Sequence, residues 1–113
     1  MKKTDKALEN TIVKVLTNVC EESLKEINGF QWLTHLVNYK DFPRPLTVIC
    51  IFETQDHLVK LLNSPQHEHL MNSIIDQLSA AGIQLPKKHK HIKFDSEEAC
   101  DREHAGNWSR RLK

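Results

Sequence analysis

The chain has 113 residues, of which 39% are hydrophobic and 27% are charged, and its formal net charge is +1. This length allows one domain with a single core, and the composition is far from that of disordered chains. No apolar stretch approaches the roughly 18 residues that cross a membrane, and three widely spaced cysteines suggest neither a disulfide framework nor a zinc site. We therefore expect one cytoplasmic domain, residues 1–113, without a signal peptide.

The first expected element is a long helix. Thr4 or Asp5 is expected to cap its start, and Asn28-Gly29 is expected to end it in the left-handed conformation. Its apolar residues recur every three or four positions, as on the buried face of a helix: Leu8, Ile12, Val15, Leu16, Val19, Cys20, Leu24 and Ile27.

Two strands are expected next, at residues 30–39 and 46–53. The first, FQWLTHLVNY, is rich in aromatic and branched residues, and the second, LTVICIFE, is an almost continuous apolar run typical of a central strand. Pro43 and Pro45 cannot donate to a ladder, so residues 40–45 are expected to connect the two strands. An antiparallel hairpin is therefore predicted.

Two helices are expected after the hairpin. Ser64-Pro65 opens the second helix and Gly82 closes it. The first is capped by Thr54 and has as its apolar side Leu58, Val59, Leu61 and Leu62.

A third strand is expected in the segment KKHKHIKFD after Pro86, because polar and apolar residues alternate there. Ile92 and Phe94 are predicted on its inner face. Its outer face is predicted to carry His89, His91 and Lys93. The core of the domain is thus residues 1–95.

Residues 96–113 are expected to form a short helix and a basic tail. Asp95 and Glu98 form a variant of the capping box, and Gly106 is the natural terminator. Cys100 and His104, four positions apart, are expected to share the face that touches the sheet.

Two chemical alternatives exist for this helix. A metal site would need His89 and His91 to fold back beside Cys100 and His104. A catalytic pair of Cys100 and His104 is disfavoured, because acidic neighbours raise the pKa of a thiol.

The positive charge is concentrated in residues 86–113, which hold eight Lys or Arg against five Asp or Glu. Such a patch can bind phosphates even in a nearly neutral protein. Trp108, beside two arginines, either stacks on a base or pins the tail to the core. The candidate nucleic-acid-binding residues are Lys87, Lys88, Lys90, His91, Lys93, Trp108, Arg110, Arg111 and Lys113.

The predicted order resembles the type II KH arrangement of ribosome-binding factor A and related domains, over roughly residues 4–95. The resemblance implies an α+β, two-layer α-β-β-α-α-β(-α) domain with a mainly antiparallel or mixed three-stranded sheet. RNA-gripping KH domains carry a GxxG loop between the two central helices, whereas this chain has LNSPQHEH there. The phosphate-clamping residues of KH domains therefore have no counterpart.

The segments GFQWLTHLVNYKDFP, SIIDQLSAAGIQL and IKFDSEEACDREHAGNWSRR also resemble a family of small gammaproteobacterial proteins, some labelled Fis-like transcriptional regulators. A Fis-type DNA reader ends in a helix-turn-helix, whereas this chain predicts a basic strand, an acidic helix and a basic tail. No functional residue is carried over from Fis.

These features predict a binding module without catalysis that engages RNA, the ribosome or DNA through its basic C-terminal face. The alternative is a protein-interaction or dimerisation module that uses the hairpin edge near Trp32 or the tail around Trp108. An enzyme is not expected, because the chain has no glycine-rich phosphate loop and no paired nucleophile and base. No cofactor, metal or membrane partner is predicted.

Overall fold

The computed structural model describes residues 3–37, 46–85 and 88–112. The elements follow the predicted order, with two short helices, α4 and α6, in addition. Their bounds are α1 (Lys3–Glu26), β1 (Phe30–Leu36), β2 (Thr47–Phe52), α2 (Gln55–Leu62), α3 (Pro65–Ala80), α4 (Lys88–His91), β3 (Ile92–Ser96), α5 (Glu97–His104) and α6 (Trp108–Arg111).

The three strands form one mixed sheet in the order β1-β2-β3. β1 is antiparallel to β2, as the predicted hairpin requires, and β3 is parallel to β2. The parallel pairing is possible because α2 and α3 carry the chain back along the sheet before β3 begins. The predicted α+β class, with a mixed three-stranded sheet and β2 in its centre, is confirmed.

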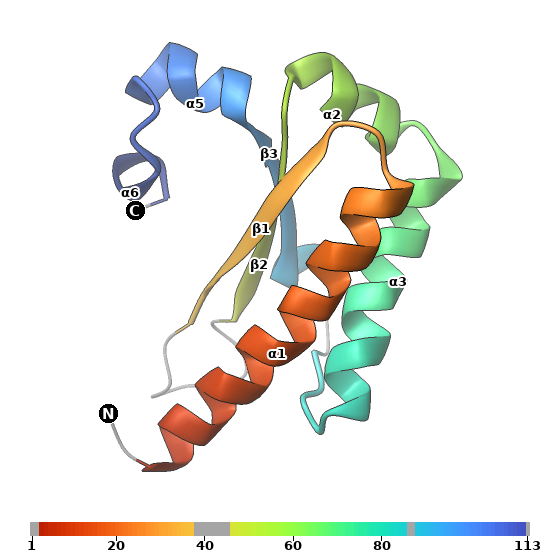
Figure 1. Ribbon diagram of the computed structural model, residues 1–113, viewed down its shortest axis with the longest axis vertical. Helices are drawn as coiled ribbons and strands as arrows, with labels where there is room; N and C mark the ends of the chain where they lie inside the picture. The colour runs from red at the N-terminus through yellow and green to blue at the C-terminus, as the bar shows by residue number, and fades with distance from the viewer. Residues whose placement is uncertain (1–2, 38–45, 86–87, 113) are drawn as a thin grey trace.

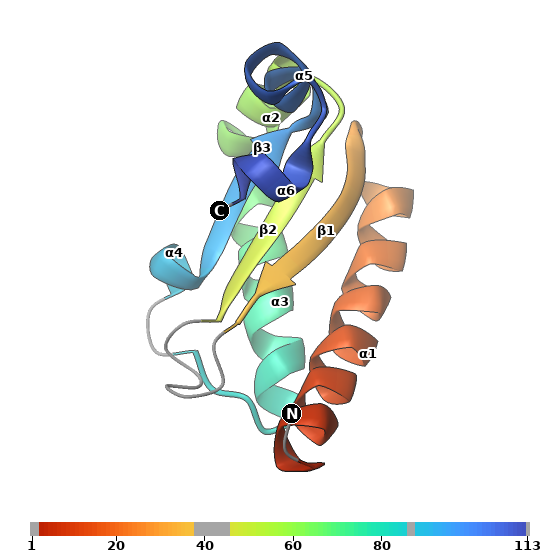
Figure 2. The ribbon, with the colours of Figure 1, turned by 90° about the vertical axis from the view of Figure 1, so that its left-hand side faces the viewer.

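Helices cover both faces of β2. Figure 2 shows α1 and α3 behind the sheet and α6 in front of it. On the α1/α3 side, Val48, Cys50 and Phe52 of β2 join the main core. Four further buried apolar residues lie outside that core: Ile49 and Ile51, which alternate with the core residues of β2 and so point to its opposite, outer side, and Ala99 and Cys100 of α5. The continuous apolar run of β2 reflects this burial on two sides.

In two helices the buried face includes fewer residues than the apolar face predicted from the sequence. In α1, Leu24 is 52% exposed, although Ile12, Leu16 and Val19 are buried as expected. In α2, Leu58 and Leu61 are buried, whereas the neighbouring Val59 and Leu62 are exposed. The three-and-four spacing fixes the direction of a face but not its width.

The ends of α1 differ in how well they were predicted. The helix already includes Lys3, so neither Thr4 nor Asp5 is its cap. At the other end Gly29 has a φ of +84°, as the predicted left-handed stop requires.

The third strand is shorter than predicted. Residues 88–91 form the helical turn α4, and the strand begins only at Ile92. His91 is buried and its Nδ1 lies 2.8 Å from the carbonyl oxygen of Leu46, so its predicted place on an outer strand face is wrong. The helical turn directs the imidazole inward, where a carbonyl at the start of β2 satisfies it.

Helix α5 is capped by Ser96, whose hydroxyl accepts a hydrogen bond from the backbone N–H of Ala99 at 3.1 Å. The predicted cap residue, Asp95, lies one position too early and bonds elsewhere. Ala105 and Gly106 both adopt positive φ, so the predicted terminator is present but begins one residue earlier.

Candidate functional site

The nine predicted nucleic-acid-binding residues have different settings. Lys87 and Lys113 lie outside the described residues, and Lys88 is the first residue of α4. Three cations are exposed to solvent, namely Lys90, Lys93 and Arg110. The other three, His91, Trp108 and Arg111, are engaged within the protein.

Arg111 is held by carboxylates of its own chain. Its Nε and Nη2 donate to the two carboxylate oxygens of Asp95 at 2.6 and 2.8 Å, and its Nη1 donates to Glu103 at 3.1 Å. The hydrogen bond with Asp95, more than that with Glu103, raises the pKa of the guanidinium, although burial opposes it. Only 16% of the Arg111 side chain remains exposed. The guanidinium group therefore connects α6 to the sheet and is not available to bind a phosphate.

Trp108 packs against Trp32 of β1. Their rings form an edge-to-face pair with centroids 5.1 Å apart. Both indoles donate to the carboxylate of Glu97, Trp32 to Oε1 and Trp108 to Oε2, the latter at 3.3 Å. This geometry matches a residue that pins the C-terminal segment to the sheet.

Cys100 and His104, which lie four positions apart on α5, have different settings. Cys100 is fully buried, and this burial raises the pKa of its thiol. The Nδ1 of His104 lies 3.3 Å from a guanidinium nitrogen of Arg111. Among the described residues, no group of three His, Cys, Asp or Glu side chains could hold a metal ion.

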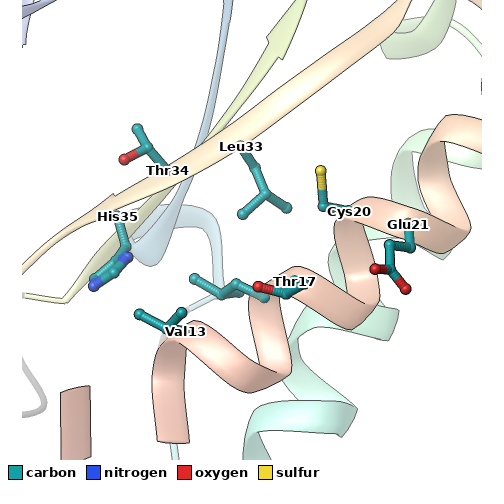
Figure 3. A pocket seen from close by; sticks show the side chains of 8 residues that line it. Val13, Thr17, Cys20, Glu21, Leu33, Thr34 and His35 are labelled. Carbon is teal, nitrogen blue, oxygen red and sulfur yellow. The ribbon is translucent and has the colours of Figure 1, made fainter. Parts of the chain in front are cut away.

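A groove runs between α1 and β1 (Figure 3). Val13, Leu16 and Leu33 give it an apolar floor. Its volume is about 230 Å³, and polar side chains contribute the rest of the lining: Thr17, Cys20, Glu21, Thr34 and His35. Val13 is 47% exposed, so the apolar surface is open to solvent.

His35 and Cys20 do not form a reactive pair in this groove. They lie at its opposite ends, with Leu33 between them (Figure 3). The Nε2 of His35 is instead 3.0 Å from a carboxylate oxygen of Glu9. The groove therefore offers an apolar surface with a polar rim and lacks the nucleophile–base contact of a hydrolase.

The groove lies beside an edge strand. Within the described residues β1 pairs with β2 alone, so its other side presents main-chain N–H and C=O groups without a strand partner. The pairing with β2 is irregular between Phe30 and Trp32 and regular from residue 32 to residue 36. The regular part of β1 is the part that borders the groove.

The exposed side of α1 carries a second hollow, which lies toward α3. It measures about 650 Å³ and is lined by polar and small residues, among them Lys14, Asn18 and Gln77. Thr17 and Glu21 line both hollows, so they form a ridge between them. The one sequence signal for this surface is Val13, an apolar residue that falls outside the predicted buried face of the helix.

Comparisons of the chain with protein-family models, with curated proteins and with solved structures gave no match. Throughout the part of the chain that the structure describes, no helix combines the length and apolar character needed to cross a bilayer.

Proposed function

We propose that this protein is a non-catalytic protein-binding module that receives a strand of its partner at the free edge of β1. The observation that carries the proposal is the apolar groove directly beside that edge. An added strand gains main-chain hydrogen bonds from the edge, while its alternate side chains enter the neighbouring groove. Helix α1 forms the second wall of this site.

The lack of protection along β1 supports the proposal. Soluble proteins commonly block edge strands with lysine, proline or a covering segment. Residues 32–36, WLTHL, contain neither lysine nor proline, and Leu36 is 42% exposed. The opposite edge, β3, does carry such protection, because Lys93 projects from it and Asp95 fastens it to Arg111.

The size and charge of the groove disfavour other ligands. Pockets for small molecules typically have volumes of about 300–1,000 Å³, and this groove, at about 230 Å³, is smaller. The carboxylate of Glu21 lines the groove and that of Glu9 contacts His35 at its end, so a phosphate would be repelled there. A peptide strand needs only a shallow apolar channel.

The three free cysteines suit a reducing compartment, and we propose that the protein acts in the cytoplasm.

Photo-crosslinking in cells tests this proposal. A photoreactive amino acid replaces Val13 in the groove or, as a control, Val59 on α2, because both side chains are 47% exposed. We expect defined protein adducts from position 13 and none of the same size from position 59. If position 13 gives no adduct that position 59 lacks, the groove is not a protein-binding site.

Nucleic-acid binding remains a second candidate because Lys90, Lys93 and Arg110 are exposed. The test replaces all three with glutamine and measures affinity for RNA, DNA and ribosomes against salt concentration. Each lost phosphate contact should flatten the plot of log affinity against log salt by about 0.9 for duplex DNA or about 0.7 for a single strand. An unchanged slope, or no binding by the unmodified protein at low salt, would remove this candidate.

A further inference from the structure

We infer that the partner strand is β1 of a second copy of this chain, so that two protomers form a continuous six-stranded sheet. This inference rests on the proposed function and names its partner. In such a dimer the two β1 strands pair antiparallel about a two-fold axis, and the two α1 helices meet on one face of the joined sheet. A two-fold contact requires a surface that is complementary to itself.

β1 and α1 lie on the same side of the molecule, in front of the elements beside them. In Figure 1 both lie toward the viewer, in front of β2 and α3, and in Figure 2 both lie on the right-hand side. A flat approach from that direction brings a partner against the strand edge and the helix together. Two copies related by a two-fold axis can therefore pair their strands and pack their helices at once.

The middle residues of the two contact surfaces line the same groove. Thr34 is the middle residue of the regular part of β1, residues 32–36. Thr17 is the middle residue of the α1 segment that lines the groove, residues 13–21. Thr34 and Thr17 border the same groove, so one axis can pass close to both.

The charges on α1 are complementary to those on a second, antiparallel copy of the same helix. Lys14 and Glu21 lie on either side of Thr17 and are seven residues apart, which places them on the same side of the helix about 10.5 Å from each other. Neither forms an ion pair with another described residue. When α1 meets α1 in the antiparallel direction, each Lys14 faces Glu21 of the partner subunit.

The shape and polarity of α1 fit the same contact. Val13, Thr17, Cys20 and Leu24 recur at spacings of four, three and four, the pattern of a helix–helix seam. Leu24 and Val13 are about half exposed. A partner helix would cover these two apolar side chains and remove them from water. The Thr17–Glu21 ridge lies between two hollows, so the ridge of one α1 can enter a hollow beside the other.

Light scattering coupled to size-exclusion chromatography tests the inference on the full chain. We expect a mass of twice 13.1 kDa for the unmodified protein. By symmetry each of Lys14→Glu and Glu21→Lys puts two pairs of like charges in contact, so each should weaken association by about tenfold or more. The double variant restores opposite charges and should dimerise again. An equimolar mixture of the two single variants should form a heterodimer, because every contact across the axis is then complementary.

The controls separate this inference from the proposed function. Lys93→Glu reverses a charge on the opposite edge of the sheet and should leave the dimer intact, and circular dichroism checks that each variant is folded. A monomeric unmodified protein, or single variants that dimerise as tightly as it does, would refute self-association. If position 13 then still crosslinks to other proteins, the groove retains its binding role and only the identity of the partner is wrong.

Discussion

The ion pair between Arg111 and Asp95 allows a quantitative test of how the C-terminal segment is held. Arg111→Met keeps the aliphatic stem and removes the guanidinium that bonds both oxygens of Asp95. Asp95→Asn removes the charge from the other partner, and the double variant completes a thermodynamic cycle. Arg110→Met is the matched control, because the neighbouring Arg110 is exposed.

The expected magnitude follows from partial burial. The side chains of Arg111 and Asp95 are 16% and 20% exposed, so their pair is neither a surface contact nor a fully buried one. Exposed pairs contribute about 0.2–1 kcal/mol, and breaking buried pairs costs about 3–5 kcal/mol. We therefore expect Arg111→Met to lower the free energy of unfolding by about 2 kcal/mol and the melting temperature by about 8 °C.

Urea unfolding followed by tryptophan fluorescence measures this effect. Trp32 and Trp108 pack together on the outer side of the sheet, where α6 is fastened. The cycle should give a coupling energy of about 1–2 kcal/mol between Arg111 and Asp95, and Arg110→Met should change stability by less than about 0.5 kcal/mol. Equal effects of the two arginine substitutions would refute the argument.

Three further predictions concern the fold. Gly29→Ala should lower the free energy of unfolding by more than about 2 kcal/mol, because the new Cβ would clash with the His57 ring. Gly82→Ala, also at positive φ but with nothing within 4 Å of its Cβ, should lower it by about 1 kcal/mol. Equal losses of the two variants in urea unfolding would contradict this. Burial, with a smaller contribution from Cys20, raises the pKa of Cys50 from 9.0 to about 12, so its contribution to stability is complete below pH 9 and is lost as the pH rises from 9 to 12. The free energy of unfolding should fall over this range by up to about 1.4 kcal/mol per pH unit, and a Cys50→Ala variant with the same slope would argue against the burial. Trp108→Ala should lower the melting temperature, as expected of a residue that pins the tail, and an unchanged value would contradict that role.

The elements that could be predicted are those whose information is local. β2 is a continuous apolar run because both of its faces are covered, and α3 begins at Ser64-Pro65 and is followed by Gly82 at positive φ. The position of His91 could not be predicted in this way. Its inward turn depends on the carbonyl of Leu46, which is 45 residues away in the chain.

The basic tail illustrates why charge counts alone are insufficient. Residues 86–113 hold more cations than anions, which predicts a positive surface. In the fold, Asp95 and Glu103 neutralise Arg111, and Glu97 accepts both indole N–H groups. The groove is equally invisible in the sequence, because it forms only when residues 13–21 lie beside residues 33–35.

The two-sided burial of β2 has a consequence for the newly made chain. During synthesis, α1, the hairpin and α3 emerge first and can cover one side of the strand. Ile49 and Ile51 point to its other side, where the C-terminal segment with α6 lies (Figure 2), so that side stays uncovered until this last segment has been added. A nascent chain paused between β2 and α5 therefore displays a bare apolar sheet face, the kind of surface that chaperones bind and that aggregates when they are scarce.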